Sequence, residues 1–189
     1  DGDKRFVDLE MQITHEICNE LEGKQLGPEP GEHWWKHRYD FYFPPHSLML
    51  PEMFGTVETT STYDKIYDIF KAKQRVITED FKEWGTDYMA HFSHWFPWGV
   101  MVYDRFLIAK PPRDPHEALQ LHTEIWGKAA RASLEHGGVF NDHHGIGFKL
   151  GWLMEEQYGP AWPMMQGIKD ALDPAGIMNP GKLGFTRRK

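Results

Sequence analysis

Two adjacent histidines near the end of the chain are candidates for acid–base chemistry. His143 and His144 precede Gly145-Ile146-Gly147, after a predicted helix and a short predicted strand. An imidazole can act as an acid, a base, a metal ligand or a hydrogen-bond donor near neutral pH. Glycines directly after it let the backbone and a ligand approach closely. The residues alone also allow a purely structural turn, in which the imidazoles bind local carbonyls.

A tyrosine in the middle of the chain offers a phenol for the same chemistry. Tyr103 ends the segment Trp98–Tyr103, in a piece of chain predicted to be extended. A phenol can donate or accept a proton beside a reacting carbon, although its pKa of about 10 has to be lowered before it acts as a base. The alternative is a tyrosine that only fills a sheet.

The hydrophobic pattern predicts the elements that hold these side chains. Apolar residues recur at three- and four-residue steps over 4–22 and 62–84, which indicates two helices. Two extended pieces are predicted at roughly 87–95 and 99–109, and Pro97-Trp98-Gly99 suits the connection of an antiparallel hairpin. Side chains at the odd positions 89 to 95 are expected to share one face of the first strand. In the second, Met101, Tyr103 and Arg105 are expected to face away from Val100, Val102, Asp104 and Phe106.

The rest of the chain is predicted to be helical after the hairpin and irregular before it. Asp114 is expected to cap a helix that ends near His136. A strand at 139–140, helices at 147–158 and 160–172, a loop at 24–33 and irregular structure at 34–57 with a helical turn near 47–53 complete the prediction. Cys18 is expected on or beside the buried stripe of the first helix. This order implies one α+β domain over residues 1–189, an antiparallel sheet with helices mainly on one face.

Composition narrows the functional class. The 189 residues carry 21 basic and 28 acidic side chains, a net charge of −7, which argues against general nucleic-acid binding. The single cysteine excludes an internal disulfide and a thiolate zinc cluster, and it fits a reducing compartment such as the cytoplasm. No apolar run approaches the roughly 20 residues of a membrane span. The 8 Trp, 12 Phe and 7 Tyr could simply fill a core, but many of them stand beside prolines and histidines in predicted loops, which favours a pocket lined by flat side chains.

The last quarter of the chain resembles a known family. Gly137-Gly138 with 143–147, followed by the segment 173–184, resembles the C-terminal domain of FAD-linked oxidases of the vanillyl-alcohol oxidase superfamily. Trp98–Tyr103 and Glu58-Thr59-Thr60 are most similar to its alkylglycerone-phosphate synthase branch. The resemblance implies a ferredoxin-like sheet that forms the substrate side of the active site. It also implies FAD, held mostly by an N-terminal segment or chain that is absent from these residues.

The resemblance also implies a reaction and its residues. The expected reaction is hydride transfer from an alcohol-type substrate, aromatic or apolar, to the flavin. The expected catalytic residues are Tyr103, His143 and His144, the substrate-binding residues are Arg38, His94 and Trp98, and the cofactor-binding residues are Gly145, Asn179 and Lys182. Arg38 could instead form a salt bridge with Glu58. No glycine-rich nucleotide fingerprint is present, so the chain alone is expected to bind FAD weakly and to be inactive. The chain could also form a homo-oligomer.

Departures from the family's motifs leave alternatives. The zone where the synthases carry a phosphate-binding arginine has the sequence Phe43-Pro44-Pro45-His46-Ser47, and Asp142 precedes His143-His144 where they have a third histidine. Both argue against the ether-lipid reaction. A zinc or iron cluster of His94, His143 and His144 would instead indicate a metal-assisted 2-hydroxy-acid dehydrogenase. The metal-binding relatives' second histidine is missing, so no metal is expected. A non-catalytic ligand-binding domain is the remaining alternative.

Overall fold

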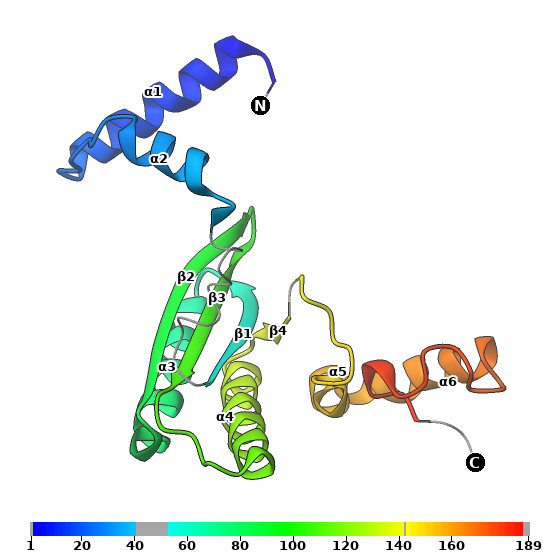
Figure 1. Ribbon diagram of the computed structural model, residues 1–189. Helices are drawn as coiled ribbons and strands as arrows, with labels where there is room; N and C mark the ends of the chain where they lie inside the picture. Colours follow the sequence, from blue (N-terminus) through cyan, green and yellow to red (C-terminus); the bar gives the residue numbers. More distant parts are fainter. Residues whose placement is uncertain (1, 41–52, 142, 187–189) are drawn as a thin grey trace. The chain divides into compact units, whose positions relative to one another are not determined.

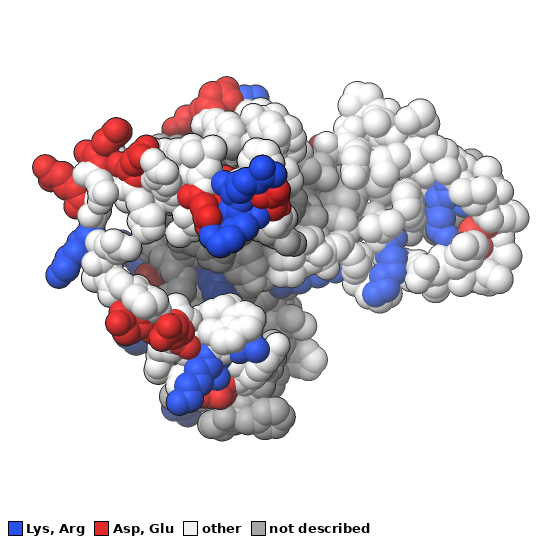
Figure 2. Space-filling view, turned by 90° about the horizontal axis from the view of Figure 1, so that it is seen from above, with Lys and Arg blue, Asp and Glu red and all other residues white. Residues whose placement is uncertain are grey.

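The computed structural model describes residues 2–40, 53–141 and 143–186. The chain divides into two compact units, Asp1–Met49 and Leu50–Lys189. The predicted helical turn near 47–53 falls almost wholly outside the described residues. None of the described helices is both long and apolar enough to cross a bilayer. On the face shown in Figure 2, acidic and basic side chains are interspersed, without a large area of one sign.

The first unit contains two helices, α1 (Lys4–Glu20) and α2 (Glu29–His37). The prediction of α1 is confirmed, but the loop predicted over 24–33 is wrong in its second half. Helix α2 begins there because a proline stands in its first turn together with Glu29 and Glu32, residue types that helix N-termini favour. Neither helix contains a buried residue. Cys18 is exposed, so its predicted place on or beside a buried stripe is also wrong.

The second unit is built on a four-stranded antiparallel sheet in the order β2-β3-β1-β4 (Figure 1). The strands are β1 (Met53–Thr62), β2 (Thr86–Phe96), β3 (Gly99–Ile108) and β4 (Val139–Phe140). The predicted β2–β3 hairpin and the short strand β4 are confirmed. The α+β class with an antiparallel sheet, as expected of a ferredoxin-like domain, is confirmed with them.

Strand β1 corrects the prediction of irregular structure up to residue 57 and of a helix from residue 62. Its sequence, MFGTVETTST, is rich in β-branched residues, which favour a pleated, half-buried surface. The helix is shorter than predicted: α3 spans Ile66–Asp80, and a separate 3-10 turn, η3, follows at Lys82–Trp84. Strand β1 lies in the middle of the sheet, between β3 and β4.

Two helices pack side by side on one face of this sheet, α3 and α4 (Pro115–Glu135) (Figure 1). Asp114 caps α4 as predicted, because its carboxylate accepts hydrogen bonds from the amides of His116 and Glu117. Between helices and sheet lies the hydrophobic core, which includes Phe106, Ile108, Ile125 and Leu153. The opposite face of the sheet is the one that carries Tyr103.

The C-terminal segment is made of short helices. They are η4 (Gly151–Leu153), α5 (Met154–Tyr158), η5 (Gly159–Ala161), α6 (Trp162–Leu172) and η6 (Lys182–Gly184). The helix predicted at 160–172 corresponds to η5 and α6. The helix predicted at 147–158 begins only at residue 151, because the glycine-containing stretch before it runs as a loop past the sheet. That loop follows the two histidines.

Candidate functional site

Tyr103 stands on the sheet face opposite α3 and α4. On β3, Val100 and Val102 pack against Ile66 and Ile69 of α3. Side chains alternate along a strand, so the half-buried Tyr103 lies on the opposite face, as predicted. His91 of β2 is its cross-strand neighbour, and the two rings stack with centroids 5.0 Å apart.

The loop after β4 brings both histidines to this tyrosine. The ring centroids of His143 and His144 lie 5.9 Å and 5.4 Å from that of Tyr103. The two imidazoles lie 4.1 Å from each other. Both side chains are about two-fifths exposed, at 41% and 43%. The structure therefore gathers the three predicted catalytic residues on one accessible face, from segments that lie about 40 residues apart in the chain.

A buried glutamate holds the histidine loop in place. Glu58 of β1 is the cross-strand partner of Tyr103, and its side chain is 2% exposed. Its Oε1 accepts hydrogen bonds from the backbone amides of His143 (3.0 Å) and His144 (2.9 Å). Its two carboxylate oxygens also lie 2.7 Å from Nδ1 of His143 and 3.2 Å from Nδ1 of His144. One carboxylate thus contacts both the backbone and the rings of the pair.

Sequence reasoning missed this role of Glu58 and considered it only as a partner for Arg38. The signal available in the sequence was a single carboxylate inside the β-branched run of β1. Its neighbours Val57 and Thr59 face the helices, so the alternation of the strand turns Glu58 toward Tyr103.

A β-bulge adds His94 to the same face. The pairing of β2 with β3 shifts between Ser93 and Trp95, and His94 has a positive φ of 50°. An extra residue in one strand reverses the alternation that follows it. The ring of His94 consequently lies 4.9 Å from that of His143. The prediction that Trp95 shares a face with His91 is wrong, since Trp95 pairs with Val100 on the helix side.

A buried ion pair supports the sheet directly beneath the site. Nζ of Lys73, on α3, lies 2.5 Å from Oδ2 of Asp104 and also donates to the Val57 carbonyl and to Oγ1 of Thr59. The hydroxyl of Tyr88 donates to the same Asp104 oxygen. Burial lowers the pKa of Lys73 and raises the pKa of Asp104. Asp104 is the residue next to Tyr103, so the network fixes the strand that carries the phenol.

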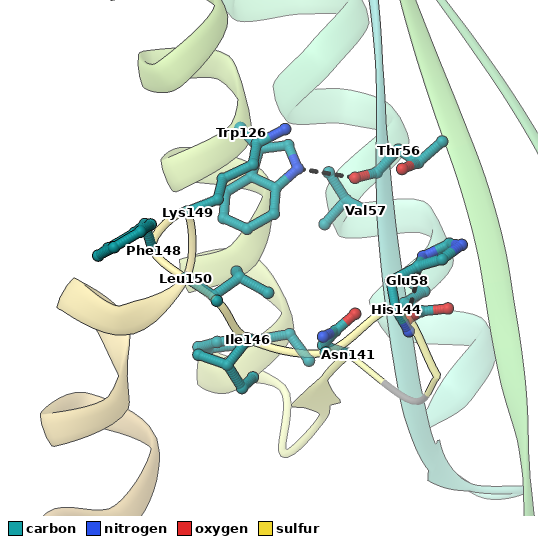
Figure 3. Close-up of a pocket in the computed structure, with 13 residues that line it drawn as sticks. Thr56, Val57, Glu58, Trp126, Asn141, His144, Ile146, Phe148, Lys149 and Leu150 are labelled. Carbon is teal, nitrogen blue, oxygen red and sulfur yellow. Dashed lines mark hydrogen bonds and ion pairs between the residues drawn. The ribbon is translucent and has the colours of Figure 1, made fainter. Parts of the chain in front are cut away.

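A hollow beside His144 lies at the edge of β1, next to the two residues that pair with β4. It has a volume of roughly 290 Å³ and is lined by β1, Trp126 of α4, Phe140 of β4, Asn141 and the stretch 144–150. Figure 3 shows Trp126, Leu150 and Ile146 on the side away from Glu58 and His144. The indole of Trp126 donates to the Thr56 carbonyl, which satisfies the open strand edge. We call this hollow the β1-edge pocket.

Two of the predicted substrate-binding residues, Arg38 and Trp98, lie against other aromatic side chains. Arg38 belongs to the first unit, where its guanidinium lies 3.9 Å from the centre of the Trp35 ring. Glu58 belongs to the second unit, where its ion-pair partners are His143 and His144. Trp98, in the hairpin turn, is exposed and stacks on Phe96 at 5.1 Å.

The predicted cofactor-binding residues lie in the loop and the terminal segment. Gly145 lines the β1-edge pocket with φ +79°, and no atom lies within 4 Å of a Cβ built on it. Asn179 has a φ of 46° and accepts a hydrogen bond from the amide of Lys182. The ammonium of Lys182 lies 3.7 Å from the centre of the Phe148 ring, which also lines the pocket.

Among the described residues, the group that could hold a metal ion is Glu58 with His143 and His144, rather than the histidine triplet considered from the sequence. Its three ligand atoms lie within 4.8 Å of one another. The separations of 2.7 Å and 3.2 Å between Glu58 and the imidazole nitrogens are those of direct ion pairs and hydrogen bonds. The geometry therefore describes a carboxylate bound to two imidazoles.

Comparison with known proteins identifies the chain's relatives. Residues 2–183 match the family described as FAD linked oxidases, C-terminal domain. Alkyldihydroxyacetonephosphate synthase from Dictyostelium discoideum is 27% identical over 187 residues, which are 97% of this chain and 30% of that protein. The same enzyme from Trypanosoma brucei brucei is 26% identical over 84% of this chain and 26% of its own.

A third relative carries a different name, and a solved structure shares the fold. Probable D-lactate dehydrogenase, mitochondrial, from Danio rerio is 38% identical over 78 residues, 41% of this chain and 16% of that protein. A structure of alkyldihydroxyacetonephosphate synthase superposes with a TM-score of 0.58 at 21% identity, over 95% of this chain and 30% of its own. The chain thus spans less than a third of the length of each of these proteins.

Proposed function

The chain belongs to the FAD linked oxidases, C-terminal domain, family, and we propose that it forms the substrate side of an FAD-dependent oxidoreductase. The proposed reaction is hydride transfer from an alcohol-type substrate to the flavin. An N-terminal segment or a separate chain would hold most of the FAD. The observation that carries this proposal is the convergence of Tyr103, His143 and His144 on one accessible sheet face.

The chemistry of this face fits a flavin ring system. It presents flat side chains that carry O–H and N–H groups, and a ring system can lie against such a surface and receive hydrogen bonds at its edge. Gly145 adds bare backbone with open space above it, so a ligand can approach closely. We assign Gly145, Asn179 and Lys182 to cofactor contacts, and His94 and Trp98 to contacts with the substrate.

Alcohol oxidation releases a hydride and a proton, which have separate destinations. When bound, the flavin supplies the redox chemistry by taking the hydride. The hydroxyl proton then passes to a base of this chain. Nδ1 of His144 faces Glu58, so a proton held on Nδ1 leaves Nε2 as the accepting nitrogen. We assign this role to His144, with the phenol of Tyr103 hydrogen-bonded to the substrate oxygen and His143 completing the proton path.

The β1-edge pocket supports an apolar or aromatic substrate body. Its lining includes the side chains of Trp126, Ile146 and Leu150, and it opens beside His144. Ligand pockets of this kind bury apolar surface and use few polar groups to fix orientation. We also propose Arg38, in the first unit, as a residue that contacts the substrate.

The reductive half-reaction tests the proposal. The flavin-loaded enzyme is mixed under anaerobic conditions with benzyl alcohol and with aliphatic alcohols, and the loss of oxidised-flavin absorbance is followed. We expect reduction by at least one of these alcohols, slowed when deuterium replaces the hydrogen on the carbinol carbon. Absence of reduction by every alcohol, or reduction with no isotope effect on the bleaching step in single turnover, contradicts hydride transfer from carbon.

A further inference from the structure

A second hollow lies on the other side of Tyr103, over strands β2 and β3. Its volume is roughly 290 Å³, and it is lined by Met89, Ala90, His91, Tyr103 and Arg105. The cross-strand pairs Met89–Arg105 and His91–Tyr103 place four of these side chains at the corners of one patch of the sheet. We call this hollow the β2–β3 pocket.

The two pockets flank the tyrosine–histidine cluster. In the strand order, β2 and β3 lie on one side of Glu58, and the open edge of β1 lies on the other. The β2–β3 pocket shares Tyr103 with the cluster, whereas the β1-edge pocket shares Glu58 and His144 with it. A substrate whose reacting carbon lies at the cluster can therefore reach both pockets.

Arg105 brings a positive charge to the β2–β3 pocket. Its guanidinium lies 5.9 Å from the centre of the Tyr103 ring. Within residues 2–40, 53–141 and 143–186, Arg105 has no ion pair with an acidic side chain. The adjacent carboxylate, Asp104, points to the helix side and is paired with Lys73. Glu58, on the site face, is occupied by the two histidines.

We propose that the β2–β3 pocket binds a carboxylate of the substrate, held by Arg105 and His91 beside Tyr103. A guanidinium presents parallel N–H groups that match the two oxygens of a carboxylate, and an imidazole adds a further donor. This inference rests on the proposed oxidoreductase function and names its substrate class: an alcohol that also carries a carboxylate.

The strand geometry places the two functional groups some distance apart. Residues two positions apart on a strand are separated by about 7 Å. Tyr103 and Arg105 are such a pair, and the Arg105 guanidinium lies 5.9 Å from the centre of the Tyr103 ring. A substrate that contacts both side chains therefore carries its carbinol carbon and its carboxylate on a spacer. An aromatic ring provides one of suitable length and also fits the flat side chains of the cluster.

Binding to residues 1–189 tests the subsite without any flavin. The probes are 4-(hydroxymethyl)benzoate and benzyl alcohol, which differ in the carboxylate, and binding is followed through the NMR signals of the His91 ring and the Arg105 side chain. We expect the carboxylate probe to shift these signals and to bind about tenfold more tightly than benzyl alcohol, the effect of a charge-assisted hydrogen-bond pair.

Three variants complete the test. Arg105→Gln is expected to abolish the preference for the carboxylate, and Arg105→Lys to retain part of it, because lysine keeps the charge but loses the planar fork. Arg75→Gln, at an exposed position of α3, is the matched control and is expected to bind like the unmodified chain.

Two results overturn the subsite: equal or undetectable binding of both probes by the unmodified chain, or unchanged carboxylate preference in Arg105→Gln. If neutral alcohols reduce the flavin but the carboxylate probe binds no more tightly than benzyl alcohol, the subsite is refuted and the proposed function stands. Carboxylate-selective binding in an enzyme whose flavin no alcohol reduces would refute the proposed function and leave the subsite standing.

Discussion

At the scale of single residues, the site depends on one buried carboxylate. Glu58 accepts hydrogen bonds from two consecutive backbone amides and contacts both imidazoles of the loop it binds. His143 and His144 lie on a segment without regular structure, so their position beside Tyr103 depends on this contact. Glu58 is therefore a positioning residue in the proposed mechanism.

Replacing Glu58 should loosen the loop in a graded way. Glu58→Ala removes the acceptor of two amides, and we expect a loss of about 1–3 kcal/mol in the free energy of unfolding, measured by urea denaturation. Glu58→Gln keeps one carbonyl oxygen and should lose less. Exposed Glu79 of α3 supplies the control, since Glu79→Ala should change stability by less than about 0.5 kcal/mol. Equal losses in all three variants would refute the anchoring role.

The sequence predicted some of these residues and not others for identifiable reasons. Tyr103 and the histidine pair could be named because their residue types and flanking glycines indicate chemistry. The role of Glu58 could not be named, because the sequence predicted irregular structure up to residue 57. The strand that turns the Glu58 side chain toward Tyr103 therefore remained unrecognised. His94 was named, but its approach to His143 depends on a bulge that simple alternation does not reveal.

At the scale of elements, two contacts tie the helices to the strands that carry the site. Lys73 of α3 bonds to β1 and to Asp104 of β3. His122 of α4 lies 3.1 Å, through Nε2, from the Phe54 carbonyl of β1. Sequence periodicity located both helices, yet it could not show which of their polar side chains are buried. That depends on the register of the strands beneath them.

Removing one partner of the buried ion pair should lower the stability of the fold strongly, whereas replacing both partners by apolar residues should lower it much less. Lys73→Met leaves the Asp104 carboxylate without its ammonium, for an expected loss of about 3–5 kcal/mol in the free energy of unfolding. The double variant Lys73→Met with Asp104→Leu should recover most of that loss. Lys71→Met, at an exposed position of the same helix, is the control. A double variant as unstable as the sum of the two single ones would contradict this account.

The contact of His122 predicts a pH dependence of stability. Burial, followed by the charge of Lys149, holds the pKa of His122 below its ordinary value of about 6.5. The unfolded chain therefore binds the proton first as the pH falls. His122 destabilises the fold increasingly as the pH drops below about 6.5 toward its folded pKa, and it has no such effect above that pH.

Urea denaturation of two variants checks this sign. In His122→Gln, stability should fall less between about pH 7 and pH 5 than in the unmodified chain. His116→Gln, at an exposed position of α4, should keep the original slope. A steeper fall in His122→Gln than in the unmodified chain would contradict the assigned direction.

At the scale of the whole molecule, the site belongs to one unit of the chain. Tyr103, Glu58, His143 and His144 all lie within Leu50–Lys189, as does the hydrophobic core. The family match, by contrast, runs through both units, over residues 2–183. The fold class could be predicted from the sequence because long periodic helices and a hairpin with alternating faces specify an α+β layer. The division of the chain could not, because α1 has the apolar periodicity of a packed helix and yet contains no buried residue, and α2 was not predicted.

The most direct test of the central claim is the rate of flavin reduction by an alcohol in single turnover, compared between the unmodified enzyme and its Tyr103→Phe and His144→Asn variants. If these side chains handle the hydroxyl proton, each variant should reduce the flavin roughly 10²- to 10⁴-fold more slowly. The isotope effect of deuterium on the carbinol carbon should remain, since hydride transfer is still required. Flavin reduction at the unmodified rate in both variants would show that the phenol of Tyr103 and the imidazole of His144 take no part in the reaction.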